Sequence, residues 1–392
     1  MNTETAGKFR AHWREIIGVF LKLGAMSYGG PAIMGLMQNE VQQKRAWLSK
    51  DNFVEGLAFV NMLPGPGATQ LGIYLGYMRG GWWGGFAAGL SFILPALFIM
   101  LTLTFVYTEY GNLPHARALF YGLSPVVVGI FAIAVYRLGK AAIKDNKQVM
   151  LALAGALALG FTPLGIIPGL LLGGAFGVAL YGSKAKGIAA ILFIAACYVV
   201  WHFSSALLPS PATSDNTGSG IWDVGLFFFQ VGAFTFGGGL TMLAFMQDQI
   251  VNQLHWLSPQ QFLDGLALGQ LTPGPILMVA AFVGYQVAAI WGALVGATAI
   301  FLPSFILMLS LLPMLERVKK IAGMKAAFKG IGPVVIGMIA VALIRMLPAA
   351  IPDSLTALLT LATLVVLLAW RRIGPLTLMV SGGVVGLLFG SV

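Results

Sequence analysis

Apolar residues form long stretches along the whole chain, and polar residues are confined to short segments between them. Several stretches approach the about 20 residues that a helix needs to cross a bilayer. These stretches are residues 82–107, 119–138, 188–208, 290–315 and 328–346. The pattern predicts an all-α polytopic membrane protein in a lipid bilayer.

Composition strengthens this prediction. Hydrophobic residues make up 58% of the chain and charged residues 9%, whereas an ordinary soluble domain carries about 25% charged residues. A water-soluble fold of this size could not cover its surface. The net charge of +10 could suggest a nucleic-acid partner, but Lys and Arg cluster in short loops beside apolar stretches. The positive-inside rule accounts for that placement, so we predict no nucleic-acid partner.

The chain contains an internal repeat. At one fixed offset, Gly24, Tyr77, Pro95 and Arg137 correspond to Gly232, Tyr285, Pro303 and Arg345. Between them, after a one-residue shift, Trp47-Leu48-Ser49 and Pro64-Gly65-Pro66 correspond to Trp256-Leu257-Ser258 and Pro273-Gly274-Pro275. We therefore predict a first repeat at 1–186, a connecting helix with an external linker at 187–220, and a second repeat at 221–392.

Loop charges predict that the two repeats are inverted relative to each other. Each repeat has six apolar elements, and an unpaired helix at 188–208 places the second repeat on the opposite side of the membrane. Lys140 and Lys144 follow the fourth element of the first repeat, whereas Arg371 and Arg372 follow the fifth element of the second. Positively charged loops thus follow even-numbered elements in the first repeat and odd-numbered elements in the second. Inverted repeats are common in secondary transporters, which bind substrate near the membrane midplane between the repeats.

Elements one and two of each repeat are broken by Gly and Pro, so they either span the membrane or form re-entrant hairpins. If they span, the loop containing Lys44, Arg45 and Lys50 lies outside, against the positive-inside rule. If they are hairpins, about 20 of the 23 basic residues become cytoplasmic. We favour the hairpins, with nine spanning helices, an internal N-terminus and an external C-terminus.

The four breaks are the candidate substrate site. Irregular backbone at membrane depth is tolerated only inside protein or against a water-filled cavity. In hairpins, the helix after each break would point its N-terminus and unpaired N–H groups at the midplane. Four such ends sum to roughly +2, which suits a small divalent oxyanion. The substrate-binding candidates are Ser27, Tyr28, Gly29, Gly30, Pro31, Pro64, Gly65, Pro66, Gly67, Thr235, Gly237, Gly238, Gly239, Pro273, Gly274 and Pro275. The alternative is that Gly and Pro only kink packed helices.

Other polar and charged side chains could have a functional role or only a structural one. Near the breaks, Asn61, Thr69, Gln70, Thr241, Gln270 and Thr272 are further candidate donors; the hydroxyl and amide groups there could equally cap local backbone. The candidates for coupling or gating are Lys22, Glu40, Glu55, Asp248 and Asp264, in which Glu40 matches Asp248 and Glu55 matches Asp264. For the acids the alternative is a solvated face, and for Lys22 a snorkelling side chain. We expect Arg137 and Arg345 to anchor helix ends, and Cys197 to pack in the interior.

Enzyme signatures are absent from the sequence. It has no G-x-x-x-x-G-K-[ST] loop, no H-E-x-x-H and no G-x-S-x-G, and its four histidines are scattered. We therefore predict no enzyme activity, no metal and no cofactor. Transport would be driven by ion gradients or by the membrane potential.

The motifs at the breaks resemble those of the chromate ion transporter family, in its long two-domain form. The matching features are Gly29-Gly30-Pro31, Trp47-Leu48-Ser49, Pro64-Gly65-Pro66 and their second-repeat counterparts, with Phe301-Leu302-Pro303-Ser304. The resemblance implies export of chromate through the inner (plasma) membrane of a bacterium, resistance to chromate, and sulfate as a similar competitor. It also implies that transport depends on the motif positions Gly29, Gly30, Pro31, Pro64, Gly65 and Pro66 and on their second-repeat counterparts. One departure is that the second repeat has Gly239 where the first repeat has Pro31. The breaks of the two repeats therefore need not contribute equally to binding.

Two other functions stay open at this point. One is proton-coupled uptake of sulfate, in which Glu55 or Asp264 would carry the proton. The other is a passive anion channel. Residue types do not distinguish a chromate site from a sulfate site. They also do not decide the oligomeric state, which could be a homodimer.

Overall fold

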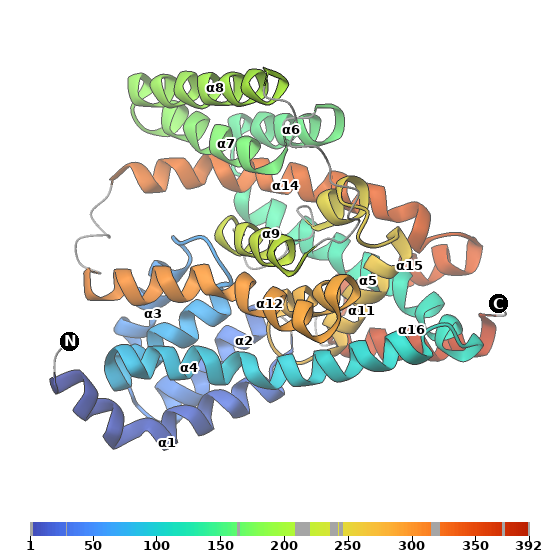
Figure 1. Cartoon of the computed structure of the whole chain (residues 1–392), viewed down its shortest axis with the longest axis horizontal. Helices are drawn as coiled ribbons and strands as arrows, with labels where there is room; N and C mark the ends of the chain where they lie inside the picture. The colour runs from blue at the N-terminus through green and yellow to red at the C-terminus, as the bar shows by residue number, and fades with distance from the viewer. Residues whose placement is uncertain are drawn as a thin grey trace.

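A computed structural model describes residues 3–28, 30–162, 165–207, 220–235, 242, 246–314, 322–370 and 373–390. Within these ranges every regular element is a helix (Figure 1), which confirms the predicted all-α class. The first half contains α1 (Thr3–Met26), α2 (Gly30–Met37), η1 (Gln38–Lys44), α3 (Lys50–Val60), α4 (Gly67–Tyr110), α5 (Pro114–Ala142), α6 (Asn146–Phe161), α7 (Ile166–Tyr181) and α8 (Lys184–Leu207). The second half contains α9 (Ile221–Ala233), η2 (Gln247–Gln253), α11 (Pro259–Leu271), η3 (Ile276–Met278), α12 (Val279–Leu311), η4 (Leu312–Met314), α14 (Ala322–Ala350), α15 (Ser354–Ala369) and α16 (Pro375–Phe389).

The first broken element folds back on itself. Lys22 Nζ on α1 lies 4.0 Å from Glu40 Oε1 on η1. Closer to the start of α1, Glu15 Oε1 lies 3.5 Å from Nη1 of Arg45, which follows η1. Early residues of one arm thus meet late residues of the other, so the arms are antiparallel. The antiparallel arms form a hairpin, as the loop charges favoured, with its base on the side where α1 begins.

The second broken element, α3 with the first part of α4, is a hairpin of the same kind. The Tyr74 hydroxyl donates to the backbone oxygen of Asn52 at 3.0 Å. Farther along α4, the Arg79 guanidinium lies 5.5 Å from the Trp47 ring, just before α3 begins. The loop at the base of the first hairpin therefore also forms the base of the second.

α4 reverses direction at Gly81, where the backbone adopts φ 66° and ψ −155°. After the reversal, residues 82–110 run back along residues 67–79. A Cβ atom built on Gly76 would lie 2.3 Å from the Ala88 Cβ and 2.4 Å from the Gly84 backbone oxygen. Only a glycine at that crossing allows the two segments to approach so closely. α4 is therefore the outgoing arm of a hairpin followed by one long helix.

The second half repeats this arrangement. α12 reverses at Ala289, with φ 48° and ψ −144°, and Gly284 then meets the Gly292 backbone oxygen just as Gly76 meets Gly84. Gly24 packs against the Phe92 backbone oxygen, and Gly232 packs against that of Ile300. These contacts join residues that correspond in the repeat, so the repeat read from the sequence is a structural repeat.

The two repeats are inverted. A Cβ atom on Gly85 of α4 would lie 3.1 Å from Leu309 of α12, and one on Gly89 would lie 2.7 Å from Phe305. Later residues of one helix meet earlier residues of the other, so these two corresponding helices run antiparallel. The predicted inversion is confirmed.

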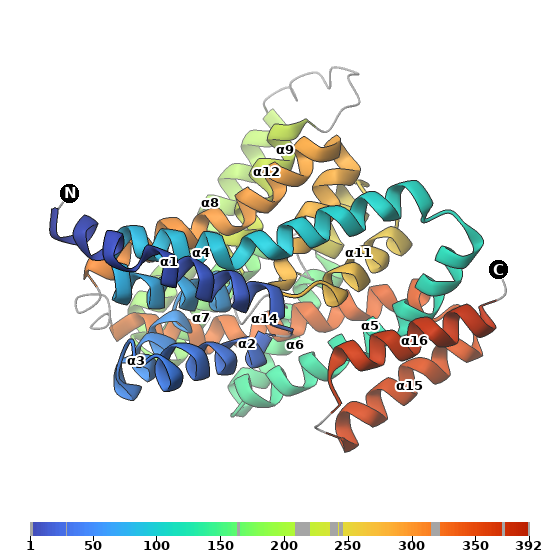
Figure 2. The ribbon, with the colours of Figure 1, turned by 90° about the horizontal axis from the view of Figure 1, so that it is seen from below.

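The last helices are exchanged between the halves. α6 and α7 of the first half pack on α14, while α15 and α16 of the second half pack on α5 (Figures 1 and 2). Arg137 Nη2 donates to the Leu367 backbone oxygen at 2.7 Å, and Arg345 Nη2 to that of Leu159 at 3.0 Å. Both guanidinium groups bind carbonyl groups near helix C-termini, as predicted for helix-end anchors. The two repeats are therefore interlocked, and the larger cluster of buried apolar residues contains residues of both.

In the described residues, four helices are long and apolar enough to cross a membrane: 67–110, 114–142, 276–314 and 325–350. α6, α7, α15 and α16 have 15 or 16 residues. At 1.5 Å per residue they reach about 24 Å, short of the about 30 Å hydrocarbon core. The prediction of nine crossings stays a prediction.

α8 lies at the periphery and packs on α7 (Figure 1). Its Leu192, Phe193 and Val200 are exposed, and so is Cys197. The predicted interior packing of Cys197 is wrong. An apolar run on a peripheral helix presents much of its surface outward, to lipid in a membrane, which sequence hydrophobicity alone does not distinguish from a protein core.

Candidate functional site

The breaks meet in two crossed pairs. Gly65 N donates to the Thr235 backbone oxygen at 2.6 Å, and Gly274 N donates to that of Ser27 at 2.6 Å. Each bond joins the second break of one half to the first break of the other. We call residues 27–28, 63–67, 234–235 and 272–275 the tip cluster. Ser27, Gly65, Thr235 and Gly274 are all buried there.

Two of these positions require glycine. Gly65 has φ 125° and Gly274 has φ 102°, a backbone region that residues with side chains rarely adopt. A Cβ atom on Gly65 would also lie 2.4 Å from both Gln70 Nε2 and Ser304 Oγ. One on Gly274 would lie 2.7 Å from the Ala96 Cβ. Conformation and space both exclude a side chain.

Helices begin directly after the tips. α2 begins at Gly30, α4 at Gly67 after an N-cap at Pro66, and η3 at Ile276 after an N-cap at Pro275. Pro31 lies in the first turn of α2, whereas Pro66 and Pro275 are N-cap residues, one position before the first turn. The first N–H groups of a helix have no acceptor within the helix and carry partial positive charge. The tip cluster therefore gathers groups suited to an anion.

Three hydroxyl groups of the tips bond their own helices instead of facing a ligand. Ser27 Oγ donates to the Leu23 backbone oxygen, Thr235 Oγ1 to that of Val231 at 2.6 Å, and Thr272 Oγ1 to that of Leu268 at 2.8 Å. The alternative of local backbone capping is correct for these three.

Gln70 and Thr69 differ from them. Both side chains are fully buried. Gln70 Nε2 donates to the Pro64 backbone oxygen at 2.6 Å and to Ser304 Oγ at 3.4 Å. Gln70 Oε1 and Thr69 Oγ1 have no hydrogen-bond partner among the described residues. A buried polar atom without a partner costs about 1–3 kcal/mol. Gln70 Oε1 can accept a hydrogen bond from water, and the Thr69 hydroxyl can donate one to water or to an anion.

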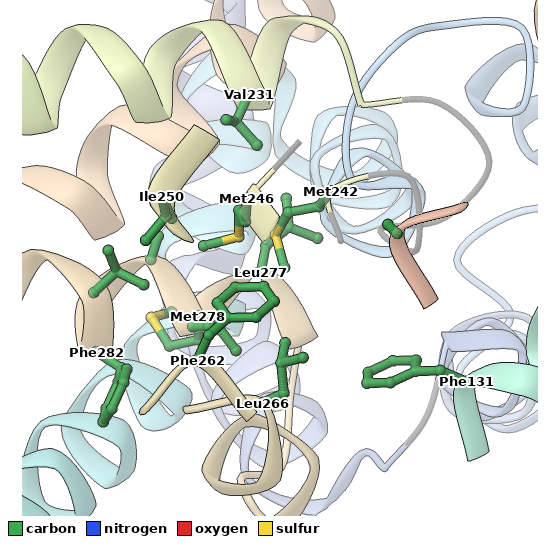
Figure 3. Close-up of a cluster of buried hydrophobic side chains, with 14 of the residues drawn as sticks. Phe131, Val231, Met242, Met246, Ile250, Phe262, Leu266, Leu277, Met278 and Phe282 are labelled. Atoms are coloured by element: carbon green, nitrogen blue, oxygen red, sulfur yellow. The ribbon is translucent and has the colours of Figure 1, made fainter. Parts of the chain in front are cut away.

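The two sides of the tip cluster are chemically unequal. Thr69, Gln70 and Ser304 lie on one side, whereas on the other side the residues soon after Pro275 are the apolar Leu277, Met278 and Val279, and Ala96 corresponds to Ser304. Figure 3 shows Met278 beside Leu277 and Phe262 in the apolar cluster of the second half. The polar side is formed by the second hairpin of the first half together with Ser304 of the second half.

The predicted site residues lie in different parts of the structure. Gly29, Gly237, Gly238 and Gly239 lie outside the described residues, as do the surroundings of Gly30 and Pro31. Pro64, Gly65, Pro66, Gly67, Pro273, Gly274 and Pro275 lie in the tip cluster. Tyr28 is exposed. Ser304 was missed, although its pairing with Ala96 in the repeat was a usable signal.

The acids Glu40 and Asp248 are held in ion pairs. Glu40 Oε2 lies 3.2 Å from Lys44 Nζ, and Lys22, whose side chain is 57% exposed, approaches Glu40 Oε1 at 4.0 Å. Asp248 Oδ1 lies 2.6 Å from Arg345 Nη1. Both acids are fixed by cations, and Lys22 lies at the surface instead of facing the tips.

Glu55 and Asp264 correspond in the repeat but lie in different surroundings. Glu55 is exposed, whereas Asp264 is 6% exposed. Asp264 Oδ2 accepts from the Tyr107 hydroxyl at 2.9 Å, and its Oδ1 accepts from Gln260 Nε2 at 2.9 Å. Gln260 Nε2 also donates to Ser124 Oγ at 3.2 Å.

Asp264 lines a pocket of about 210 Å³ between α11, α5 and the end of α14. Its other polar walls include Arg117, Tyr121, Ser124 and Gln260. Tyr121 donates to Asp353 Oδ2 at 2.6 Å, and hydrogen bonds from the Thr356 backbone N–H and from Tyr121 hold the pKa of Asp353 below its usual value. Sequence patterns did not bring Tyr107, Arg117, Ser124 or Gln260 together, because they lie on three different helices.

In the described part of the chain, no group of three or more His, Cys, Asp or Glu residues is placed to hold a metal ion.

The model of the family described as "Chromate transporter" matches residues 14–181 and 222–387. The chain is 31% identical to a chromate transport protein of Cupriavidus metallidurans, over 95% of this chain and 92% of that protein. It is 32% identical to a probable chromate transport protein of Synechococcus elongatus, over 96% of both chains. No solved structure matches.

Proposed function

Because this chain belongs to the chromate transporter family, we propose that it carries chromate, a divalent tetrahedral oxyanion, out of the bacterial cell across the plasma membrane. The proposed substrate site is the tip cluster. The observation that carries the proposal is the pair of crossed bonds from Gly65 to Thr235 and from Gly274 to Ser27. Each bond holds the second break of one half, which a helix start follows at Pro66 or Pro275, against the first break of the other half in the protein interior.

Backbone N–H groups suit a dianion that has to be released again. Buried Lys or Arg side chains would cost more to desolvate and would hold the anion too tightly. The donors at the helix starts after Pro66 and Pro275 carry partial charge only, and glycine at Gly65 and Gly274 keeps side chains away from the backbone.

Alternating access follows from the same geometry. In inverted-repeat transporters one repeat rocks against the other around a central site. Here each crossed bond links the two halves, so rocking would change the distances across the tip cluster first. An inside-negative potential favours exit of an anion by about 2.3 kcal/mol per charge per 100 mV, and thus of a dianion by about 4.6 kcal/mol.

The decisive experiment is flux of radiolabelled chromate and sulfate in proteoliposomes containing the purified full chain, with potential and pH gradient set independently. We expect chromate to leave faster when the inside is negative, and unlabelled chromate on the far side to accelerate labelled flux. A passive channel would not give that acceleration. Flux of sulfate without flux of chromate would overturn the proposal, as would the absence of both.

A further inference from the structure

Asp264 is a buried carboxyl group whose hydrogen-bond partners are all neutral. Tyr107 and Gln260 occupy its two oxygens at 2.9 Å each, and Gln260 extends the network to Ser124. The network joins three helices, α4, α11 and α5. Among the described residues, no cation forms an ion pair with Asp264, in contrast to Glu15, Glu40 and Asp248.

Neutral partners let this carboxyl group change its charge without breaking an ion pair. The Tyr107 hydroxyl can donate to the carboxylate or accept from the protonated acid. Gln260 can donate to Oδ1 in both states. A carboxyl group held by a cation, as Asp248 is by Arg345, would lose an ion pair each time it bound a proton.

Protons can reach Asp264 through the pocket of about 210 Å³ that it lines. The pocket lies where α4 ends, α5 and α11 begin and α14 ends. The charged and titratable groups around Asp264 are Tyr107 on α4, Arg117 and Tyr121 on α5, and Asp353 after α14, which is held by Tyr121. On α14, Arg345 is held by Asp248 of η2. The pocket side is external in the topology predicted from loop charge.

Asp264 is connected to the tip cluster through one helix. α11 runs from Pro259 to Leu271 and leads directly into Thr272 and Gly274. Gly274 N in turn bonds Ser27 of the other half. A change of charge at Asp264 therefore acts on the element that carries one crossed bond.

We propose that Asp264 is the proton-binding site that couples the transporter to the pH gradient, taking a proton from the pocket side in exchange for the outgoing oxyanion. This inference rests on the proposed function. The corresponding Glu55 is exposed, so it gives a matched control at the same repeat position.

The test uses proteoliposomes with the membrane potential clamped at zero and only a pH gradient imposed. Acid on the pocket side should accelerate wild-type chromate flux several-fold. Asp264→Asn, an isostere that cannot titrate, should abolish that acceleration and keep chromate exchange without a gradient. Glu55→Gln should behave as wild type. An undiminished response in Asp264→Asn, or equal losses in Asp264→Asn and Glu55→Gln, would overturn the proposal.

A second measurement does not depend on chromate. Infrared difference spectra of the full chain between acid and neutral pH should contain a protonated-carboxyl band that Asp264→Asn removes and Tyr107→Phe shifts in its pH midpoint. If Asp264→Asn does not fold, the Tyr107→Phe variant tests the proposal instead. An unchanged pH midpoint of the carboxyl band in Tyr107→Phe would contradict the proposal. A wild-type protein with the band but without chromate flux would refute the proposed function and leave the proton site standing. Chromate flux in a wild-type protein whose titrating carboxyl bands all persist in Asp264→Asn would refute the proton site and leave the proposed function standing.

Discussion

Individual residues decide whether the tip cluster can form. Gly65 and Gly274 combine positive φ with contacts that leave no room for a Cβ atom. Gln70 adds a buried amide that spans from its own tip to Ser304 of the other half. In the proposed site, substrate binding would depend on the absence of side chains at Gly65 and Gly274 and on the polar contact of Gln70 with Ser304.

Gly65→Ala should abolish chromate flux. The left-handed backbone costs an alanine about 1–2 kcal/mol, and the added Cβ displaces Gln70 or Ser304. Flux in proteoliposomes and the thermal unfolding midpoint in detergent measure the two effects. Gly35→Ala, at an exposed helical position with nothing within 4 Å, should leave both unchanged or raise stability. Normal flux in Gly65→Ala would contradict the assignment of the tip cluster as the site.

Ser304→Ala tests the inequality of the two sides. Alanine already occupies the corresponding position as Ala96, so packing should survive while Gln70 loses a partner. We expect the KM for chromate to rise about tenfold, equivalent to about 1.4 kcal/mol, with an unchanged unfolding midpoint. The reciprocal Ala96→Ser should leave KM unchanged. Equal effects of both substitutions would mean that the two sides bind alike.

At the scale of elements, the hairpins and the exchanged helices hold the fold together. Reversals at Gly81 and Ala289 turn each long helix back along a re-entrant arm. Arg137 and Arg345 then tie corresponding helix ends across the halves. The two anchors differ: in the part of the chain that the structure describes, Arg345 also neutralises an acid, Asp248, and Arg137 does not.

Arg345→Ala should therefore destabilise the protein more than Arg137→Ala. Loss of Arg345 leaves Asp248, with a side chain 11% exposed, without its cation and costs about 3 kcal/mol. Loss of Arg137 removes a charged hydrogen bond worth about 1.5 kcal/mol. Unfolding midpoints of the purified variants measure both. The double variant Arg345→Ala with Asp248→Asn should recover part of the loss; no recovery would mean that the ion pair contributes little.

At the scale of the whole molecule, both hairpins of one half have their bases on one side, and inversion places those of the other half on the opposite side. Cysteines at Gln43 and Gln253, in a Cys197→Ser background, test this in intact cells with a membrane-impermeant maleimide. Only the cysteine at Gln253 should react from outside. Because Cys197 is exposed on the peripheral α8, its replacement should cost little stability. If only the cysteine at Gln43 is labelled, the orientation in the membrane is the opposite of the predicted one. If both cysteines are labelled, the inversion of the repeats is contradicted.

The sequence by itself determined the membrane class, the repeat, its inversion and the positions of the breaks. These depend on local hydrophobicity and on which loops carry charge, both of which act on each segment separately. The prediction that Glu55 and Asp264 are equivalent could be made from the repeat, but not which of them is buried.

Tertiary structure decided the rest. The crossed bonds between tips, the exchange of α6 and α7 with α15 and α16, and the contact of Gln70 with Ser304 all join segments far apart in the chain. Asp264 is buried while Glu55 is exposed because α11 packs against α5 and α14. Such differences arise from which surfaces meet when the two halves interlock, and no local property of either half contains them.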